Sequence, residues 1–215
     1  MSIAVVLAAG AAPDREQLAP VADASLVVAA DGGLAIARRF ELPIHAVVGD
    51  LDSASDEDVA WANEAGAEIM VHSTAKDATD LELAMAHADR SAGIEKIIVF
   101  GIGGGRLDHE MGNWAVCCAS WRSTVEVHTA GGVATILRSD RNPSIELWGQ
   151  PGQAVSLIAR TGAATGVNAS GVRWPLQDAT LEPDSSLGIS NEFTETEAHI
   201  SVGGGVLIVV RPTSG

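Results

Sequence analysis

The residues of this 215-residue chain best suited to chemistry are two pairs of aspartates in loops. One pair is Asp50 and Asp52, in the stretch GDLDS directly after a short apolar run. The other is Asp77 and Asp80, in KDATD, where a loop enters a predicted helix and a spacing of three residues would place both on one face. Carboxylates brought together repel one another unless a cation neutralises them, and their hard oxygen ligands suit Mg²⁺. The spacing therefore favours a metal site, with helix capping by Asp77 or Thr79 as the alternative.

A second feature is a glycine-rich loop with one arginine, GIGGGRLDHE at 101–110. It lies between a predicted strand and a predicted helix, where backbone amides and a helix N-terminus can hold an anion. It is not a dinucleotide fingerprint, because Arg106 stands where the third glycine would be, and it lacks the lysine-containing ending of a P-loop. Arg106 could instead bind phosphate through a bidentate fork, and Asp108 could orient this arginine or reach the metal.

The elements that must position these residues are strands and helices in alternation over residues 3–128. Short apolar runs predict strands at 3–8, 25–30, 46–48, 68–71, 96–100 and 125–128. Apolar residues spaced three and four apart predict helices at 34–40, 56–65, 80–91 and 110–121. This repeat is typical of a mostly parallel sheet with helices on both faces, which binds ligands at the carboxyl ends of its strands. All the polar clusters follow predicted strands, so we expect them to converge on that edge.

The pattern changes after about residue 130, where helical periodicity disappears. Short alternating runs, separated by turn residues, predict strands at 133–138, 144–148, 154–159, 197–202 and 205–210. Such a pattern indicates a β-sandwich or small barrel. We therefore predict an α/β domain over residues 1–131 and an all-β sandwich domain over 132–215.

Composition limits the partners and the compartment. The formal net charge is −15, from 28 acidic and 13 basic residues, which disfavours binding to nucleic acid or an anionic membrane. Adjacent Cys117 and Cys118 are poorly placed for a structural disulfide, which favours a reducing compartment. The N-terminal apolar run has no basic segment before it and is too short for a membrane span. We therefore expect a cytoplasmic protein.

Several stretches, taken in order, resemble the thiamine pyrophosphokinase (thiamine diphosphokinase) family: ADGG, GDLDS, KDATDLELA, GGRLDHEMGN, GVRWPL and SNEF. Each piece alone is weak, but their order and spacing extend across most of the chain. The resemblance implies an N-terminal Rossmann-like α/β domain that binds ATP and a C-terminal β-sandwich that contributes to the thiamine site. It also implies an Mg²⁺-dependent transfer of a diphosphoryl group from ATP to the thiamine hydroxyl, release of AMP, and a homodimer.

The same resemblance assigns roles to residues near the phosphates. By the family's pattern, the metal would be held by Asp50, Asp52 and Asp80, and the triphosphate would lie near Lys76, Asp77, Thr79, Arg106 and Asp108. In the ADGG turn, Asp31 precedes Gly32 and Gly33, whose lack of side chains would let the backbone approach the nucleotide. Either Asp80 or Asp108 could accept the hydroxyl proton.

For thiamine, the resemblance points to the C-terminal domain. Trp174 matches an aromatic position of the family and is the candidate platform for the flat rings, with a core or interface role as the alternative. Ser190 and Asn191 resemble the family's substrate-contacting pair. Leu51 replaces the more usual phenylalanine, and the loop at 175–187 is generic in composition. Two alternatives therefore stay open: a diphosphokinase of another heterocyclic alcohol, such as a pterin, or a catalytically silent nucleotide- or vitamin-binding module.

Overall fold

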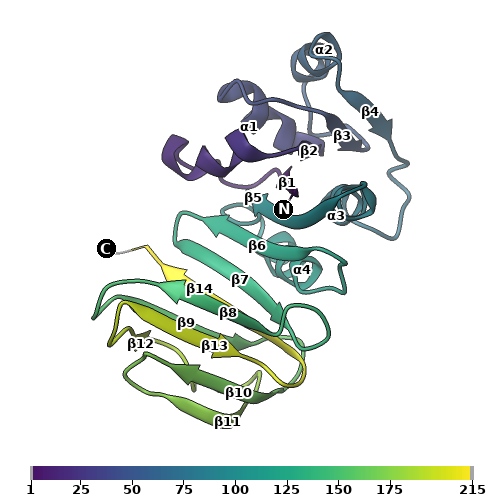
Figure 1. Cartoon of the computed structure of the whole chain (residues 1–215). Helices are drawn as coiled ribbons and strands as arrows, with labels where there is room; N and C mark the ends of the chain where they lie inside the picture. Colours follow the sequence, from purple (N-terminus) through teal and green to yellow (C-terminus); the bar gives the residue numbers. More distant parts are fainter. Residues whose placement is uncertain (1, 214–215) are drawn as a thin grey trace. The chain divides into compact units, whose positions relative to one another are not determined.

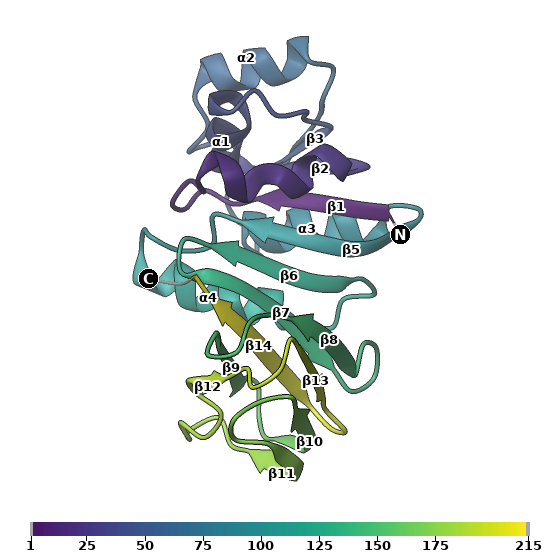
Figure 2. The same cartoon turned by 60° about the vertical axis from the view of Figure 1, so that its left-hand side comes forward.

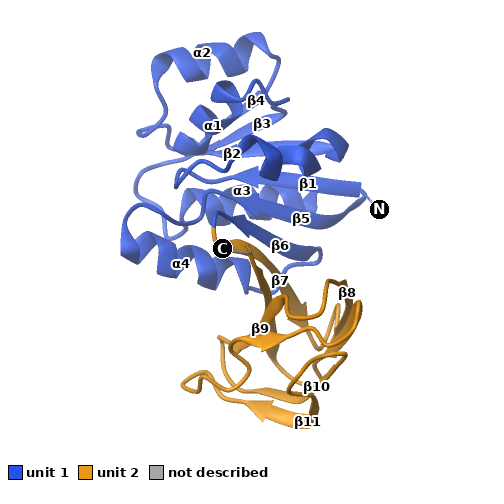
Figure 3. Ribbon diagram, turned by 90° about the vertical axis from the view of Figure 1, so that its left-hand side faces the viewer, with its two compact units in different colours: residues 1–130 blue, residues 131–215 orange. Residues whose placement is uncertain are grey.

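The computed structural model describes residues 2–213 and divides into two compact units, residues 1–130 and 131–215 (Figure 3). The boundary lies one residue before the division expected from the change in sequence pattern. None of the helices within residues 2–213 has the length and apolar character needed to cross a membrane.

The first unit contains a parallel sheet in the order β6-β5-β1-β2-β3-β4 (Figure 1). Its strands are β1 (Ser2–Leu7), β2 (Leu26–Ala30), β3 (Ala46–Gly49), β4 (Glu68–Val71), β5 (Ile94–Phe100) and β6 (Thr124–Thr129). The central strands are buried on both faces, which is why they appear in the sequence as continuous apolar runs. The predicted parallel α/β fold is confirmed.

Helices cover both faces of this sheet. They are η1 (Arg15–Asp23), η2 (Asp31–Gly33), α1 (Leu34–Arg39), α2 (Asp56–Glu64), α3 (Asp80–Arg90) and α4 (Leu107–Cys117). Leu18 and Val21 of η1 pack with α1 and α2 over one face, whereas α3 contacts β1, β2, β3 and β5 (Figure 2). Helix α4 begins three residues earlier than predicted, and η1 was not predicted. Because η1 is a 3₁₀ helix with Pro20 inside it, it lacks the 3.6-residue periodicity that indicates an α-helix.

The second unit is the predicted β-sandwich. Its strands are β7 (Gly132–Arg138), β8 (Ser144–Trp148), β9 (Ala154–Ala159), β10 (Ala164–Ser170), β11 (Leu176–Leu181), β12 (Asn191–Glu192), β13 (Glu197–Ser201) and β14 (Val206–Pro212). Antiparallel pairs form two layers, β12-β9-β14-β7 and β11-β10-β13-β8, around one apolar core. The pattern missed β10, β11 and β12. Strand β10 reads ATGVNAS, which has little β-branched content and includes a left-handed Gly166.

A charged group on β5 and β6 provides a test of the first unit's stability. The carboxylate of Glu126 lies 2.9 Å from Lys96 Nζ and 2.6 Å from His128 Nε2. Burial alone would raise the pKa of Glu126, but the hydrogen bonds from His128 and Lys96 outweigh it and hold the pKa at about 2. Because the pKa is lower in the folded state, ionised Glu126 stabilises the fold above its ordinary pKa near 4.5, and this contribution is lost as pH falls toward 2.

We therefore expect Glu126→Gln to lower the free energy of unfolding by about 2 kcal/mol at pH 7. The difference from wild type should shrink as the pH falls below about 4.5. Urea unfolding of both proteins between pH 7 and about pH 2.5, which spans the unfolded and folded pKa values of Glu126, measures it. A deficit that stays constant over this range would show that the ionised carboxylate is not what stabilises the fold.

Candidate active site

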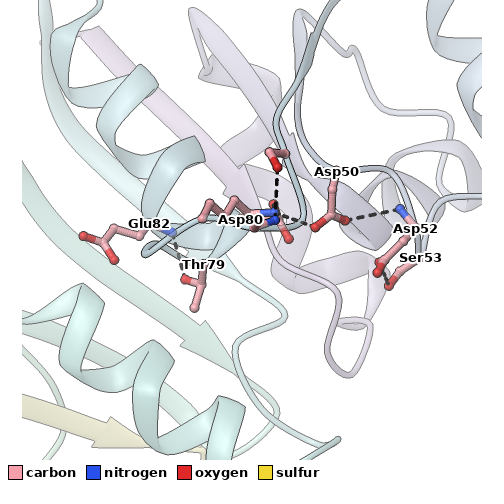
Figure 4. Close-up of polar contacts among 9 residues, drawn as sticks. Asp50, Asp52, Ser53, Thr79, Asp80 and Glu82 are labelled. Carbon is pink, nitrogen blue, oxygen red and sulfur yellow. Dashed lines mark hydrogen bonds and ion pairs between the residues drawn. The ribbon is translucent and has the colours of Figure 1, made fainter.

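The loop after β3 presents Asp50 and Asp52 around a left-handed residue. Leu51 has φ +64°, an unusual conformation for a residue with a branched side chain, and its side chain packs against the core of the first unit. The Asp52 N–H donates to Asp50 Oδ1 at 3.3 Å, and Ser53 Oγ donates to Asp52 Oδ1 at 3.0 Å (Figure 4). Packing of Leu51 thus supports a tight loop that exposes two carboxylates to one site.

Asp31 completes an acidic group with these two residues. One oxygen from each of Asp31, Asp50 and Asp52 lies within 4.8 Å of the others. Asp31 follows β2, which pairs with β3 so that Ala30 lies opposite Val48. The resemblance placed Asp31 in a nucleotide-binding turn, whereas the structure brings its carboxylate beside those of Asp50 and Asp52.

Gly49 makes this close approach possible. A Cβ atom at this position would lie 2.8 Å from Asp31 Cβ and 3.1 Å from Asp80 Oδ1. Real Cβ atoms do not come so near to other carbon atoms, so any side chain here would push the aspartates apart.

We expect Gly49→Ala to lower kcat about 100-fold, because a shift of about 1 Å at a catalytic group has that effect, and to destabilise the fold by about 2 kcal/mol. The matched control is Gly112→Ala in α4, where a Cβ atom meets nothing within 4 Å. Activity assays and thermal unfolding of both variants test this. Equal kcat values for the two would show that spacing around Gly49 does not matter.

Asp80 reaches the site because α3 crosses back over the sheet. Although α3 follows β4 in the chain, it packs on β1, β2, β3 and β5, so its first residue lies near the ends of β2 and β3. Thr79 is the N-cap, and its Oγ1 accepts a hydrogen bond from Glu82 N at 3.3 Å (Figure 4). Asp77 precedes the helix and is exposed, so the predicted shared helix face with Asp80 is wrong.

Lys76 holds two of these carboxylates. Its Nζ lies 2.5 Å from Asp50 Oδ2 and 3.0 Å from Asp80 Oδ1. The hydrogen bond from Lys76 lowers the pKa of Asp50 below its ordinary value. The side chain of Lys76 is mostly buried, so this ammonium group is part of the acidic site and not a surface charge.

Two carboxylate oxygens in the site have no hydrogen-bond partner among the described residues. They are Asp31 Oδ1 and Asp80 Oδ1; Lys76 approaches the latter without hydrogen-bond geometry. Burial, reinforced by the charges of Asp80 and Asp52, raises the pKa of Asp31. Buried acceptors are rarely left unpaired, so these oxygens suit a bound cation.

The glycine-rich loop is joined to the loop after β1. Gly10 N donates to Gly101 O at 2.8 Å, and Ala11 N donates to Gly103 O at 2.7 Å. A Cβ on Gly10 would lie 2.3 Å from each of these carbonyl oxygens, so only glycine fits there. Backbone from two strand ends therefore forms one wall of the site.

Arg106, at the start of α4, is bound by its neighbour Asp108. Two parallel hydrogen bonds join them, Nε to Oδ1 at 3.1 Å and Nη2 to Oδ2 at 2.6 Å. They lower the pKa of Asp108 to about 2. Of the two options left open for Asp108, the structure shows the one in which it orients the arginine.

A cavity of about 520 Å³ lies at the carboxyl ends of β1, β2, β3 and β5, and many of the residues described above line it. Its lining includes six of the predicted residues: Asp31, Asp50, Asp52, Thr79, Asp80 and Arg106. The lining does not include Gly32, Gly33, Lys76, Asp77 and Asp108. Sequence reasoning missed Gly10, Ser53, His109, Glu110 and Asn113, which also line it. A glycine two residues after the predicted strand at 3–8 was a signal for the first of these.

The glycines of the ADGG turn have a packing role. A Cβ on Gly33 would lie 2.0 Å from Leu7 O, and one on Gly32 would lie 3.2 Å from the Cβ atoms of Ala9 and Ser53. The missing side chains therefore let the turn after β2 lie against the end of β1.

In the second unit, Trp174 and Asn191 are joined by hydrogen bonds. The Trp174 side chain is about half exposed, whereas Asn191 is buried. Asn191 Nδ2 donates to Trp174 O at 2.8 Å, and Trp174 N donates to Asn191 Oδ1 at 3.0 Å. Ser190 is exposed, with φ +60°. Trp174 and Ser190 are thus accessible at the surface, whereas Asn191 is inside.

The first unit therefore has a cavity at the carboxyl edge of a parallel sheet, lined by carboxylates, an arginine and glycine-rich backbone. Such a site is typical of α/β proteins that bind phosphate groups.

Comparison with known proteins identifies the family. The model for "Thiamin pyrophosphokinase, catalytic domain" matches residues 19–129, and that for "Thiamin pyrophosphokinase, vitamin B1 binding domain" matches residues 140–207. The chain belongs to the thiamin pyrophosphokinase family and is an enzyme of the diphosphotransferase class. The predicted family is thereby confirmed, and the alternatives considered above are not favoured.

Individual relatives agree with this assignment. The chain is 27% identical over 186 residues to a thiamine pyrophosphokinase of Bacillus subtilis, covering 80% of this chain and 79% of the relative. It is 28% identical over 163 residues to thiamine pyrophosphokinase 1 of rice, covering 72% and 61%. A crystal structure of the Geobacillus thermodenitrificans thiamin pyrophosphokinase superimposes with a TM-score of 0.77 at 25% identity, covering 100% of this chain and 99% of that one. The Bacillus subtilis structure, at 24% identity with full coverage of both chains, has a TM-score of 0.82 and supports the fold.

Proposed function

We propose that this protein transfers a diphosphoryl group from ATP to the hydroxyl group of thiamine, giving thiamine diphosphate and AMP. The observation that carries the proposal is the cavity of the first unit, which combines a group of three aspartates with an arginine, all inside the region matched by the family's catalytic model. Transfer of this kind depends on positioning and charge neutralisation more than on covalent catalysis.

Mg²⁺ fits the acidic group, and Asp31, Asp50 and Asp52 would hold it, with Asp80 beside them. The buried Asp31 Oδ1, which has no hydrogen-bond partner among the described residues, supports this assignment, which adds Asp31 to the ligands that the family's pattern implies. A bound Mg²⁺ would neutralise the phosphate charge. Lys76 and Thr79, next to these carboxylates, remain our candidates for neighbours of the triphosphate.

In this proposal Arg106 binds the phosphates of ATP, and Asp80 accepts the proton of the thiamine hydroxyl. Arg106, oriented by Asp108, holds the phosphates through its planar fork. Asp108 is a poor proton acceptor, because both its oxygens are bound to Arg106 and its pKa is about 2. We therefore favour Asp80 as the group that accepts the hydroxyl proton of thiamine.

The second unit would bind thiamine, with the half-exposed ring of Trp174 as the platform. We also propose a homodimer, because each unit exposes large apolar side chains: Leu107 and Met111 of α4 in the first, and Leu187 and Ile189 in the second. A cytoplasmic location is proposed on the basis of the adjacent buried Cys117 and Cys118.

Acceptor competition tests the proposal. Purified protein is incubated with ATP and Mg²⁺, and with thiamine, a hydroxymethylpterin or both. We expect diphosphorylated thiamine alone, no inhibition by the pterin, and loss of product when EDTA removes the metal. Diphosphorylated pterin would assign the protein to a different acceptor, and binding without any product would indicate a silent module.

A further inference from the structure

Trp174 lies in a segment that is fixed by a second stretch of the chain. Val172 forms a β-bridge with Phe193, Arg173 N donates to Glu192 O at 2.8 Å, and Thr194 N donates to Gly171 O at 2.9 Å. Residues 171–174 therefore run antiparallel to residues 191–194. The backbone that carries the exposed ring is an ordered ribbon, not a loose loop.

Asn191 uses its side chain to close this ribbon at Trp174. Its Nδ2 donates to Trp174 O, and its Oδ1 accepts from both Trp174 N and Glu192 N, the latter at 2.9 Å. The side chain is 3% exposed, and both lone-pair positions of its oxygen are occupied. Because Pro175 follows, the backbone of Trp174 is restricted further to an extended conformation.

The ring of Trp174 is also covered on one face. The guanidinium carbon of Arg173 lies 4.8 Å from the ring centroid, and Arg173 Nη1 lies 3.1 Å from Glu192 Oε2. A cation at this distance stacks on the ring, and the pairing with Glu192 keeps it in place. Trp174 is nevertheless 52% exposed, so part of the residue remains accessible to a ligand.

We propose that Asn191 is a positioning residue for thiamine: it does not contact the substrate and fixes the backbone of Trp174 so that one ring face is presented to it. This inference rests on the proposed function, in which Trp174 is the platform. It also revises the expectation that Asn191 belongs to a substrate-contacting pair, because its hydrogen-bonding groups face Trp174 and Glu192.

A double-mutant cycle tests this role, using Asn191→Ala, Trp174→Ala and the combination. We expect Asn191→Ala to raise the KM for thiamine about 10-fold, with kcat and the KM for ATP little changed. In a protein that already carries Trp174→Ala, the same substitution should raise the KM for thiamine by less than about 2-fold, because Asn191 acts only by positioning Trp174. The matched control is Asn168→Ala, which removes an exposed asparagine of the same unit with its own backbone hydrogen bonds and should leave the KM for thiamine unchanged.

Each other outcome has a definite meaning. An equal rise in KM from Asn191→Ala with and without Trp174 would overturn the proposal and make Asn191 a direct contact. If Trp174→Ala leaves the KM for thiamine unchanged while thiamine diphosphate still forms, positioning through Trp174 is wrong but the proposed function stands. Absence of diphosphate product from the wild-type protein would instead overturn the proposed function.

A second measurement does not depend on activity. Acrylamide quenching of the Trp174 emission is obtained by subtracting the signal of Trp174→Phe, since the chain has five tryptophans. Asn191→Ala should increase this quenching because the ring becomes mobile. If Asn191→Ala does not fold, Asn191→Asp, which keeps the acceptor and loses the donor to Trp174 O, replaces it in both experiments. Unchanged quenching in a folded variant would contradict the proposal.

Discussion

Replacing Asp50 with asparagine is expected to lower kcat about 1,000-fold while the protein stays folded. Asp50 has two kinds of charged neighbour in the site. It belongs to the acidic group with Asp31 and Asp52, and it also binds Lys76. The substitution removes one of the negative charges that would hold a cation, without changing the size of the side chain. Because Lys76 lowers the pKa of Asp50, loss of this ion pair should lower the unfolding temperature somewhat, and thermal unfolding confirms that the variant is folded at the assay temperature.

We expect the loss of kcat only when a carboxylate of the acidic group is replaced, and not when a carboxylate elsewhere in the first unit is replaced. Asp56→Asn is the matched control, because Asp56 is an exposed carboxylate in the first turn of α2 and does not line the cavity. Calorimetric titration with Mn²⁺ alone should show weaker binding to Asp50→Asn and unchanged binding to Asp56→Asn. Near-normal turnover by a folded Asp50→Asn protein would remove this residue from the catalytic site.

Replacing Arg106 with lysine is expected to lower kcat/KM for ATP about 100-fold with no change in stability. Arg106 is largely exposed, so it supports no core packing, but Lys cannot form the planar two-point contact that Arg makes with phosphate. Asp108→Asn should have a smaller effect, about 10-fold, because Arg106 remains and only its orientation is lost.

The chain contains a natural control for this pair. Arg138 binds Asp140, two residues further on, through the same two-bond geometry, with contacts of 3.1 and 3.3 Å. Arg138 lies in the second unit and does not line the cavity, so Arg138→Lys should leave kcat/KM for ATP unchanged. Steady-state kinetics of both lysine variants make the comparison, and a similar loss in each would show that Arg106 has no special role.

The first unit was predictable from the sequence because strands that are buried on both faces of a sheet consist almost entirely of apolar residues. Strands such as β2 and β3 are apolar throughout, and α2 and α3 carry the expected spacing, so their positions follow closely from the pattern. The second unit was harder. Strand β10 and the two-residue β12 are defined by their partners across the sheet, and little in their own sequences indicates a strand.

Several of the site residues could be predicted from the sequence, but which of them lie next to one another could not. Asp50 and Asp52 could be recognised locally, whereas the third member of the acidic group, Asp31, depends on the pairing of β2 with β3. Asp80 reaches the site only because α3 crosses back over the sheet, which no local pattern reveals. For Asn191 the residue type was noticed, but burial decides its role and burial comes from the fold.

The most direct test of the central claim is the identity of the products. Purified protein with ATP, Mg²⁺ and thiamine should give thiamine diphosphate and AMP in equal amounts, measured by chromatography of the same reaction, and no product without thiamine. Formation of ADP with a thiamine monophosphate would contradict the proposed diphosphoryl transfer. Absence of both products from a folded protein that binds ATP would contradict the assignment of this cavity as a catalytic site.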